Sequence, residues 1–326
     1  MLKTKAHKVI LSPLPQAQDI FQSDLKKVDQ VIYDQISSSV PLTDQITSYI
    51  MEDPGKRLRP LLTLLAARLF NSASNPKAIT LAACIEFIHT ATLLHDDVID
   101  QSLLRRGKQC ANHVWGNEAS ILVGDFLFSR AFEMLVEMGS LPLLKILSKT
   151  ITTMAEGELL QIMVQGDLNM KEETYLKIIQ AKTAQLFSAA CGGGGMVAEA
   201  SEEEIQALES YGHNLGMLFQ ITDDLLDYSL ESSGDDLREG KITLPVILAY
   251  RQASEKEKVF WRDLIKNKEN IDQAVLLLRS QGIKNLTLEK AKIFQQNCVD
   301  SLGIFPDSTE KSLLVELVNF CLYRNA

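Results

Sequence analysis

The chain has 326 residues, of which 46% are apolar and 23% charged, so it can bury a large core and differs from disordered sequences. Its formal net charge of -9 excludes a general polyanion binder, because affinity for nucleic acid comes mainly from clustered lysine and arginine. The composition indicates a globular protein whose partners are not nucleic acids.

Apolar residues recur at three- and four-residue spacing along the chain, and alternating runs rich in Val, Ile and Thr are nearly absent. This pattern predicts an all-α fold, in which the helices form one large bundle. In chain order, we expect helices over residues 16–38, 43–51, 58–70, 76–101, 116–137, 141–165, 171–191, 202–229, 242–251, 255–267, 269–281, 285–302 and 308–323.

The segments between the predicted helices are short. Turn signals occur at Asp53-Pro54-Gly55, Asn75-Pro76, Arg106-Gly107 and Ser232-Ser233-Gly234-Asp235, where proline and glycine interrupt the apolar pattern. None of these segments is long enough to be a linker, and the sequence has no internal repeat of about 20 to 50 residues. We therefore predict a single domain over residues 1–326.

The cysteines and the N-terminal segment bear on where the protein works. The five cysteines are scattered, odd in number and without a C-x-x-C pair, which is typical of reduced thiols and not of disulfides or a zinc site. The apolar run Val9-Ile10-Leu11 is too short for a signal peptide, and no stretch of 18 or more residues lacks a charge. We expect a cytoplasmic protein with no membrane span.

Two aspartate-rich segments each follow a strongly apolar helical segment. They are His95-Asp96-Asp97-Val98-Ile99-Asp100, the first aspartate motif, and Thr222-Asp223-Asp224-Leu225-Leu226-Asp227, the second aspartate motif. In each motif the first and last aspartates are four residues apart, so they stack on one helical face. One such motif alone is more often a solvated helix end, but two copies on apolar helices favour a shared site.

Charge repulsion indicates what these motifs bind. Two carboxylates ~6 Å apart at an effective dielectric of ~20 repel by roughly 3 kcal/mol, so six of them on apolar helices need cations. Ligands that are all oxygen favour Mg²⁺, which bridges carboxylates to substrate phosphates. We therefore predict a magnesium site for a diphosphate substrate. The predicted metal ligands are Asp96, Asp97, Asp100, Asp223, Asp224 and Asp227.

Each motif has an uncharged polar residue upstream on the same helical face. His89 lies seven residues before Asp96, and Gln220 lies seven residues before Asp227, which is two helical turns in each case. Alone, His89 would be read as a hydrogen-bonded core histidine. Its shared face with the aspartates makes it a candidate for substrate binding.

Basic residues lie near the predicted helix ends and motifs. Arginine offers a planar fork for two phosphate oxygens and lysine a compact charge, so such a set could hold a diphosphate. Any one of them alone would be read as surface charge. The candidates are Lys56, Arg57, Arg59, Arg105, Arg106, Lys182 and Lys241.

Several segments have the residues and order of a known family. They are Gly55-Lys56-Arg57-Leu58-Arg59-Pro60, residues 86–100 with Arg105-Arg106-Gly107, Gly124-Asp125-Phe126-Leu127, Glu156-Gly157-Glu158, Lys182-Thr183-Ala184, residues 219–227 and residues 234–241. Over nearly its full length the chain resembles the trans-isoprenyl (polyprenyl) diphosphate synthases, and most of all the bacterial long-chain, octaprenyl-type enzymes.

The resemblance implies an all-α isoprenoid synthase fold with a central substrate cavity, and a homodimer. It implies that isopentenyl diphosphate binds to Lys56, Arg59, His89 and Arg106. It implies that the allylic diphosphate binds to Arg105, Lys182, Thr183, Gln220 and Lys241. In this family Asp96, Asp100 and Asp223 correspond to magnesium ligands. We expect Lys182 and the six aspartates to be the catalytic residues.

The resemblance also implies a mechanism. Metal ions and basic side chains neutralise the allylic diphosphate as it leaves, and the isopentenyl double bond attacks the allylic cation that remains. A proton is then lost to the diphosphate held in the site, which accounts for the lack of an evident histidine or glutamate base. An apolar helical core protects the cation from water.

Product length is set, in this family, partly by the residues four and five positions before the first aspartate. Here these are Thr92 and Ala91, whose small side chains indicate an open channel, and Phe132 or Met134 could form a deeper stop. We expect farnesyl diphosphate as the primer and a long product, such as octaprenyl diphosphate for quinone side chains.

Other functions compete with this interpretation. A short-chain farnesyl or geranylgeranyl diphosphate synthase would share the motifs. A non-catalytic regulatory subunit of a heteromeric synthase would be expected to lose Asp or Arg positions, and none are lost here. A terpene cyclase is disfavoured by the second D-x-x-x-D repeat, and a metal phosphohydrolase by the lack of further histidine ligands.

Two positions depart from the family pattern. Pro54 stands where a second glycine is expected, and the run of residues 192–195 is four glycines in a segment expected to be helical. Glycine costs roughly 1 kcal/mol per helical position, so this run should loosen or break the helix that follows Lys182 and Thr183.

Overall fold

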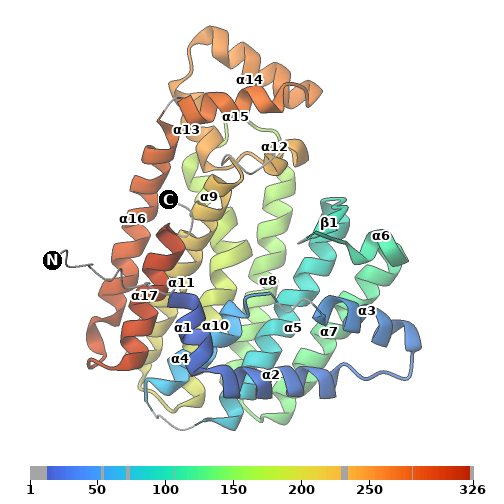
Figure 1. Cartoon of the computed structure of the whole chain (residues 1–326), viewed down its shortest axis with the longest axis vertical. Coiled ribbons are helices and arrows are strands. Elements are labelled where there is room, and N and C mark those ends of the chain that lie inside the picture. Colours follow the sequence, from blue (N-terminus) through green and yellow to red (C-terminus); the bar gives the residue numbers. More distant parts are fainter. Residues whose placement is uncertain are drawn as a thin grey trace, which may run out of the picture.

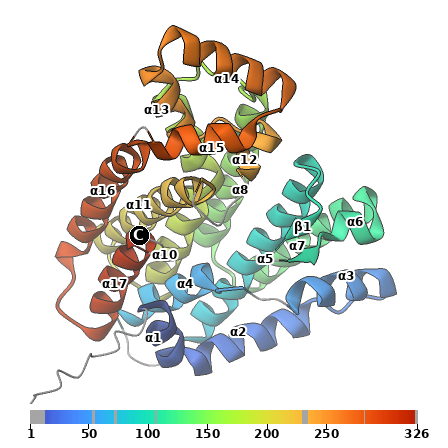
Figure 2. The same cartoon turned by 45° about the horizontal axis from the view of Figure 1, so that its top comes forward.

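A computed structural model describes residues 13–52, 55–70, 74–105, 107–228, 234–280 and 282–323. The candidate site residue Arg106, the departure Pro54, the apolar run 9–11 and the turn residues Asp53, Ser232 and Ser233 lie outside the described residues. The described chain forms a bundle of helices, with the helices over residues 283–301 and 309–323 along one side and the helices over residues 244–280 at one end (Figures 1 and 2).

The elements follow the helical pattern closely. The α-helices are α1 (Pro13–Ile20), α2 (Gln22–Gln35), α3 (Pro41–Met51), α4 (Leu58–Arg68), α5 (Pro76–Ile99), α6 (Ala111–Trp115), α7 (Asn117–Glu137), α8 (Leu141–Met163), α9 (Glu172–Ile179), α10 (Gln185–Val197), α11 (Glu202–Leu226), α12 (Asp235–Glu239), α13 (Leu244–Gln252), α14 (Glu255–Asn267), α15 (Ile271–Ser280), α16 (Ile283–Ser301) and α17 (Thr309–Tyr323). A π turn, η1 (Gln180–Ala184), and a 3₁₀ turn, η2 (Leu302–Ile304), join some of them.

Strands contribute almost nothing to the described residues. β1 (Leu104–Arg105) and β2 (Lys108–Gln109) pair antiparallel, with Leu104 opposite Gln109. They form a small hairpin beyond the end of α5. The prediction of an all-α fold is confirmed.

The core is built around α5, which carries the first aspartate motif near its C-terminal end. Asn75 caps this helix by accepting hydrogen bonds from the backbone N–H groups of Lys77 and Ala78, and Pro76 fits its first turn. The helix packs against α2, α4, α7 and α10. It is long and apolar enough to cross a membrane, yet 72% of its most apolar window is buried inside the protein, as expected of a core helix.

The second aspartate motif lies at the C-terminal end of α11. Ser201 begins this helix with a capping box, in which its hydroxyl accepts from the backbone N–H of Glu204 and the Glu204 carboxylate accepts from the backbone N–H of Ser201. The helix packs against α10 and α16. Both motifs therefore lie at the C-terminal ends of long, capped helices, where Asp97 and Asp224 are buried and Asp223 is exposed.

The prediction that the glycine run breaks its helix is wrong. Helix α10 continues through residues 192–195 to Val197. A Cβ on Gly194 would lie 2.5 Å from the carbonyl oxygen of Thr63, and one on Gly193 would lie 2.9 Å from Cδ2 of Leu81. The glycines let α4 and α5 approach α10 closely, and the packing gained offsets the low helix propensity.

Other helix limits differ from the sequence prediction for identifiable reasons. The region predicted as one helix over 171–191 is interrupted by the π turn η1, and such turns are frequent at functional sites. The short helix α12 was not predicted. It is enclosed by Gly234 and Gly240, whose φ angles of 70° and 83° are left-handed, so it has no periodicity long enough to be read.

Candidate functional site

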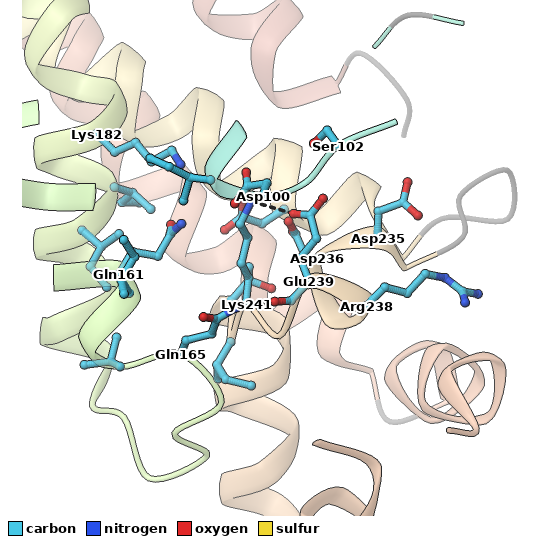
Figure 3. Close-up of a pocket in the computed structure, with 18 of the residues that line it drawn as sticks. Asp100, Ser102, Gln161, Gln165, Lys182, Asp235, Asp236, Arg238, Glu239 and Lys241 are labelled. Carbon is cyan, nitrogen blue, oxygen red and sulfur yellow. Dashed lines mark hydrogen bonds and ion pairs between the residues drawn. The ribbon is translucent and has the colours of Figure 1, made fainter. Parts of the chain in front are cut away.

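A cavity of about 870 Å³ lies where α5, α8, α9, η1 and α11 meet the segment around α12. Figure 3 shows Asp100, Glu239 and Lys241 grouped in its lining, with Lys182 on the side of α8. The residues predicted from the sequence that line it are Asp100, Lys182, Thr183, Gln220, Asp224 and Lys241. The fold therefore brings residues from four distant parts of the chain to one space.

The carboxylates of the first aspartate motif face lysines. Lys241 donates to Oδ2 of Asp100 across 2.7 Å, and Nζ of Lys182 lies 3.8 Å from Oδ2 of Asp96. Burial raises the pKa of Asp96 to about 6, against the opposing effect of Lys182. Burial alone would lower the pKa of Lys241, but Asp100 and Glu239 outweigh it and raise that pKa. The ammonium groups therefore neutralise this motif in part.

The second aspartate motif is held by hydrogen bonds. Asp224 is buried, and its Oδ2 accepts from the Tyr175 hydroxyl at 2.6 Å while its Oδ1 accepts from Nε2 of Gln220 at 2.7 Å. The Thr183 hydroxyl donates to Oε1 of Gln220 at 2.8 Å. Burial raises the pKa of Asp224 to about 7, although the hydrogen bonds from Tyr175 and Gln220 lower it. Asp227 accepts from the backbone N–H groups that begin α12.

Asp97 is engaged in a different place. It is buried, and its Oδ1 accepts two hydrogen bonds from Arg105, at 2.9 Å from Nε and 2.7 Å from Nη2. Both residues line a second pocket of about 90 Å³, which His89 also lines. The predicted role of Asp97 as a metal ligand stays a prediction, and its observed contact is with Arg105.

The basic residues near the start of α4 make different contacts. Arg59 and His89 meet, with Nη1 of the arginine 3.1 Å from Nε2 of the histidine, and the guanidinium lies 4.5 Å from the centroid of the Phe187 ring. Burial lowers the pKa of Arg59 to about 10. Lys56 is exposed, and its Nζ is 5.7 Å from the centroid of the Phe320 ring. Arg59 is therefore engaged with His89 and Phe187, whereas Lys56 is exposed.

Arg57 differs from its neighbours because its guanidinium is buried. Nη1 donates to Oε1 of Glu86 at 2.6 Å, and Nη2 lies 3.0 Å from Oδ1 of Asp29. Its backbone has φ 46° at the start of α4, a left-handed conformation that such contacts must hold in place. This geometry favours an anchoring role for Arg57, which ties α4 to α2 and α5.

The residues predicted to set product length lie outside both pockets. Ala91 is fully buried, and Thr92 is half-buried with its hydroxyl donating to the carbonyl oxygen of His89 at 2.7 Å. Phe132 is half-buried and packs against the hydrophobic core from α7. Their effect on product length stays a prediction.

The donor set fits a divalent cation that is shared with a substrate. Asp96 and Asp100 supply hard oxygen atoms on one face of α5, and each already faces a positive charge. Among the described residues, no three or more His, Cys, Asp or Glu side chains are grouped so that they could hold a metal ion by themselves. Such an open set matches magnesium, which keeps several ligand positions for water and phosphate oxygens.

Three residues of the site were not predicted from the sequence, namely Glu158, Tyr175 and Glu239. Glu158 contacts Lys182, and Glu239 accepts from Lys241 at 2.6 Å. Tyr175 lies seven residues before Lys182, the same interval that separates His89 from Asp96, and this spacing was the available signal. The two glutamates stand in segments that resemble the family, 156–158 and 234–241, but no helical spacing linked them to their lysines.

Comparison with known proteins places the chain in a family. The polyprenyl synthetase family model matches residues 40–278. The octaprenyl diphosphate synthase of Haemophilus influenzae is 39% identical over 97% of this chain and 98% of its own length. The octaprenyl diphosphate synthase of Escherichia coli is 39% identical over 96% of this chain and 99% of its own length.

Solved structures agree. A decaprenyl diphosphate synthase from Rhodobacter capsulatus has a TM-score of 0.91 at 39% identity, covering 96% of this chain and 100% of that one. A polyprenyl synthase from Caulobacter crescentus, crystallised with calcium and isoprenyl diphosphate, has a TM-score of 0.92 at 42% identity, covering 96% of this chain and 98% of that one. The resemblance seen in the motifs is confirmed, and the chain is a prenyltransferase that belongs to the polyprenyl synthetase family.

Proposed function

We propose that this chain is an all-trans polyprenyl diphosphate synthase, which condenses isopentenyl diphosphate with an allylic diphosphate, with farnesyl diphosphate as primer, and makes a long product such as octaprenyl diphosphate. The observation that carries this proposal is the cavity of about 870 Å³, which is lined by one carboxylate of each motif and by lysine side chains. Its lining includes Asp100, Asp224, Lys182, Lys241, Thr183 and Gln220. The long-chain relatives at 39% identity support it.

The allylic diphosphate is assigned to the cations and donors of this cavity. Lys182 and Lys241 supply ammonium groups, and the Thr183–Gln220 pair supplies uncharged hydrogen-bonding groups. Arg105, which lines the second pocket, completes the set implied by the family resemblance. Mg²⁺ is assigned to Asp96, Asp100 and Asp223, with Asp97, Asp224 and Asp227 beside them. When bound, Mg²⁺ would neutralise charge on the departing diphosphate.

The reaction follows from this arrangement. The bond between C1 of the allylic substrate and the diphosphate oxygen breaks, its electron pair stays with the oxygen, and Lys182 and Lys241 stabilise the charge. The double bond of isopentenyl diphosphate then attacks the allylic carbon, and a proton from C2 goes to the released diphosphate. Apolar residues of α5, α10 and α11 exclude water from the cation.

Isopentenyl diphosphate is assigned to the cations around α4. Arg59 and His89 lie together, and Lys56 is exposed beside them in sequence. Arg106 completes the predicted set but lies outside the described residues. Arg57 was predicted from the sequence to bind phosphate, and we assign it instead to holding Lys56 and Arg59 in place, since Asp29 and Glu86 occupy its guanidinium.

A homodimer is also proposed. Large apolar side chains are exposed on α7 and α8, where a second copy would bury them. They are Ile121, Leu122, Val136, Leu141, Leu159, Ile162 and Met163. Light scattering coupled to size-exclusion chromatography should give twice the chain mass, and a monomer would contradict the proposal. A cytoplasmic location stays a prediction.

The function has a direct test. The purified chain is incubated with Mg²⁺, isopentenyl diphosphate and farnesyl diphosphate, and the dephosphorylated products are sized by chromatography. We expect elongation to a long product. No elongation with any allylic primer would overturn the enzyme assignment and favour a regulatory subunit, whereas products that stop at farnesyl or geranylgeranyl length would overturn only the long-chain assignment.

A further inference from the structure

Lys182 is held between two carboxylates that come from different helices. It contacts Glu158 of α8, and its Nζ lies 3.8 Å from Oδ2 of Asp96 on α5. Glu158 reaches it because α8 and η1 are very close at Gly157, where a Cβ would lie 2.6 Å from Cβ of Ala181. The glycine of the Glu-Gly-Glu segment thus has a packing reason, and the glutamate after it meets the lysine of the site.

Lys241 has a matching arrangement on the other side of the first aspartate motif. Its Nζ lies 2.7 Å from Oδ2 of Asp100 and 2.6 Å from Oε2 of Glu239. Gly240 separates the glutamate from the lysine, and its left-handed φ of 83° turns the chain so that both side chains reach the same place. Lys182 and Lys241 therefore each bridge one aspartate of the first motif and one glutamate.

Binding of a metal ion would disturb the contact between each lysine and its aspartate. A divalent cation bound to Asp96 and Asp100 would compete with the two ammonium groups for the same carboxylates. Each lysine would then lose its aspartate and keep its glutamate. Because an ammonium has three donors, it can keep that glutamate and still donate to a phosphate oxygen.

We propose that Glu158 and Glu239 are positioning residues, which hold the ammonium groups of Lys182 and Lys241 at the cavity when metal ions displace them from Asp96 and Asp100. This inference rests on the proposed function of the cavity as a diphosphate site. Within the Glu-Gly-Glu segment, Glu158 takes this role, and Gly157 lets α8 approach η1. The glutamates act through the lysines and do not touch the substrate themselves.

The test is a double-mutant cycle on ligand binding. Glu158→Gln, Lys182→Met and the double variant are compared with the unmodified full-length chain, and binding of inorganic pyrophosphate in the presence of Mg²⁺ is measured by calorimetry. Glutamine keeps the size of the side chain and removes its charge. The same cycle is made for Glu239 and Lys241. Glu156→Gln is the matched control, because Glu156 is exposed on the same turn of α8.

Each Glu→Gln change should weaken pyrophosphate binding by about ten-fold, the size expected for one charge-assisted contact. The Glu→Gln change should weaken binding little further in a variant whose partner lysine is already replaced, because the glutamate acts only through that lysine. In turnover, KM for the allylic substrate should rise more than KM for isopentenyl diphosphate. Glu156→Gln should bind pyrophosphate as the unmodified chain does.

Two results would overturn the proposal. One is unchanged pyrophosphate binding in both Glu→Gln variants; the other is additive effects of Glu158→Gln and Lys182→Met, which would mean that the glutamate acts independently of the lysine. Each variant must give a circular dichroism spectrum like that of the unmodified chain. If Glu158→Gln fails this requirement, Glu158→Asp replaces it. An unmodified chain that binds no pyrophosphate with Mg²⁺ would instead count against the proposed function.

Discussion

The two aspartate motifs have the same spacing in the sequence but different surroundings in the structure. In the first motif, Asp96 and Asp100 face the ammonium groups of two lysines, which lie at the ends of long side chains from other elements. In the second motif, Asp224 is held by Tyr175 and Gln220. The long, flexible lysine side chains can move when a ligand binds, whereas Tyr175 and Gln220 hold Asp224 in place.

This difference separates two tasks. In the first motif, Asp96 and Asp100 face lysines whose positive charges metal ions could replace, so these two aspartates should matter for turnover more than for stability. The second motif also holds structure together, since Asp227 accepts the backbone N–H groups of Asp235 and Asp236 and so fixes the start of α12. Substitutions there should affect both stability and turnover.

The largest effect is expected for Asp96→Ala. Turnover should fall by about 10³-fold or more, because the magnesium ion that would neutralise the departing diphosphate in the transition state loses a ligand. The free energy of unfolding in urea should change by less than about 1 kcal/mol, since Lys182 keeps Glu158 as its partner. Full activity in this variant would remove the metal assignment.

The control for this variant is Asp300→Ala. Asp300 is exposed on α16 and accepts a hydrogen bond from Gln296 within the same helix. Turnover in the control should equal that of the unmodified chain.

Asp227→Ala should reduce stability and turnover together. Two backbone N–H groups lose their acceptor, which costs about 1–2 kcal/mol in the free energy of unfolding. The loosened α12 carries Glu239, next to Lys241, so turnover should fall by about 10²-fold. Urea denaturation and product assays measure the two effects. Normal stability together with lost turnover would show that the two motifs do not differ in the way described.

Arrangements within one helix could be predicted from the sequence. His89, Asp96 and Asp100 share a face of α5 because they are separated by multiples of about one turn, and α5 is helical throughout this stretch. The all-α class and both aspartate motifs could be predicted from the same helical spacing. Periodicity needs only the local chain.

Partners from separate elements could not be predicted. The contacts of Lys182 with Glu158 and of Tyr175 with Asp224 depend on how α8, η1 and α11 are offset, which no local pattern encodes. The same holds for Arg57, which the sequence predicted as a phosphate ligand and whose guanidinium contacts Asp29 and Glu86. The glycines of α10 were misread because propensity is local and their packing is not.

Tyr175→Phe tests the fixed character of the second motif with a single atom removed. Asp224 keeps Gln220 as a donor and loses the 2.6 Å hydrogen bond to its Oδ2. Turnover should fall by about ten-fold and the free energy of unfolding by about 1 kcal/mol. Tyr33→Phe, at an exposed position of α2, is the control and should change neither quantity. Equal turnover in the two variants would mean that Tyr175 does not fix the motif.

Removal of metal should have the smallest effect on stability. If Lys182 and Lys241 already balance the charge of Asp96 and Asp100, then EDTA should change the urea unfolding free energy of the substrate-free chain by less than about 1 kcal/mol. The double variant Lys182→Met, Lys241→Met lacks that balance, so millimolar Mg²⁺ should stabilise it more than it stabilises the unmodified chain. Equal responses to Mg²⁺ in both proteins would mean that the lysines do not stand in for metal ions, and the contrast between the two motifs would lose its electrostatic basis.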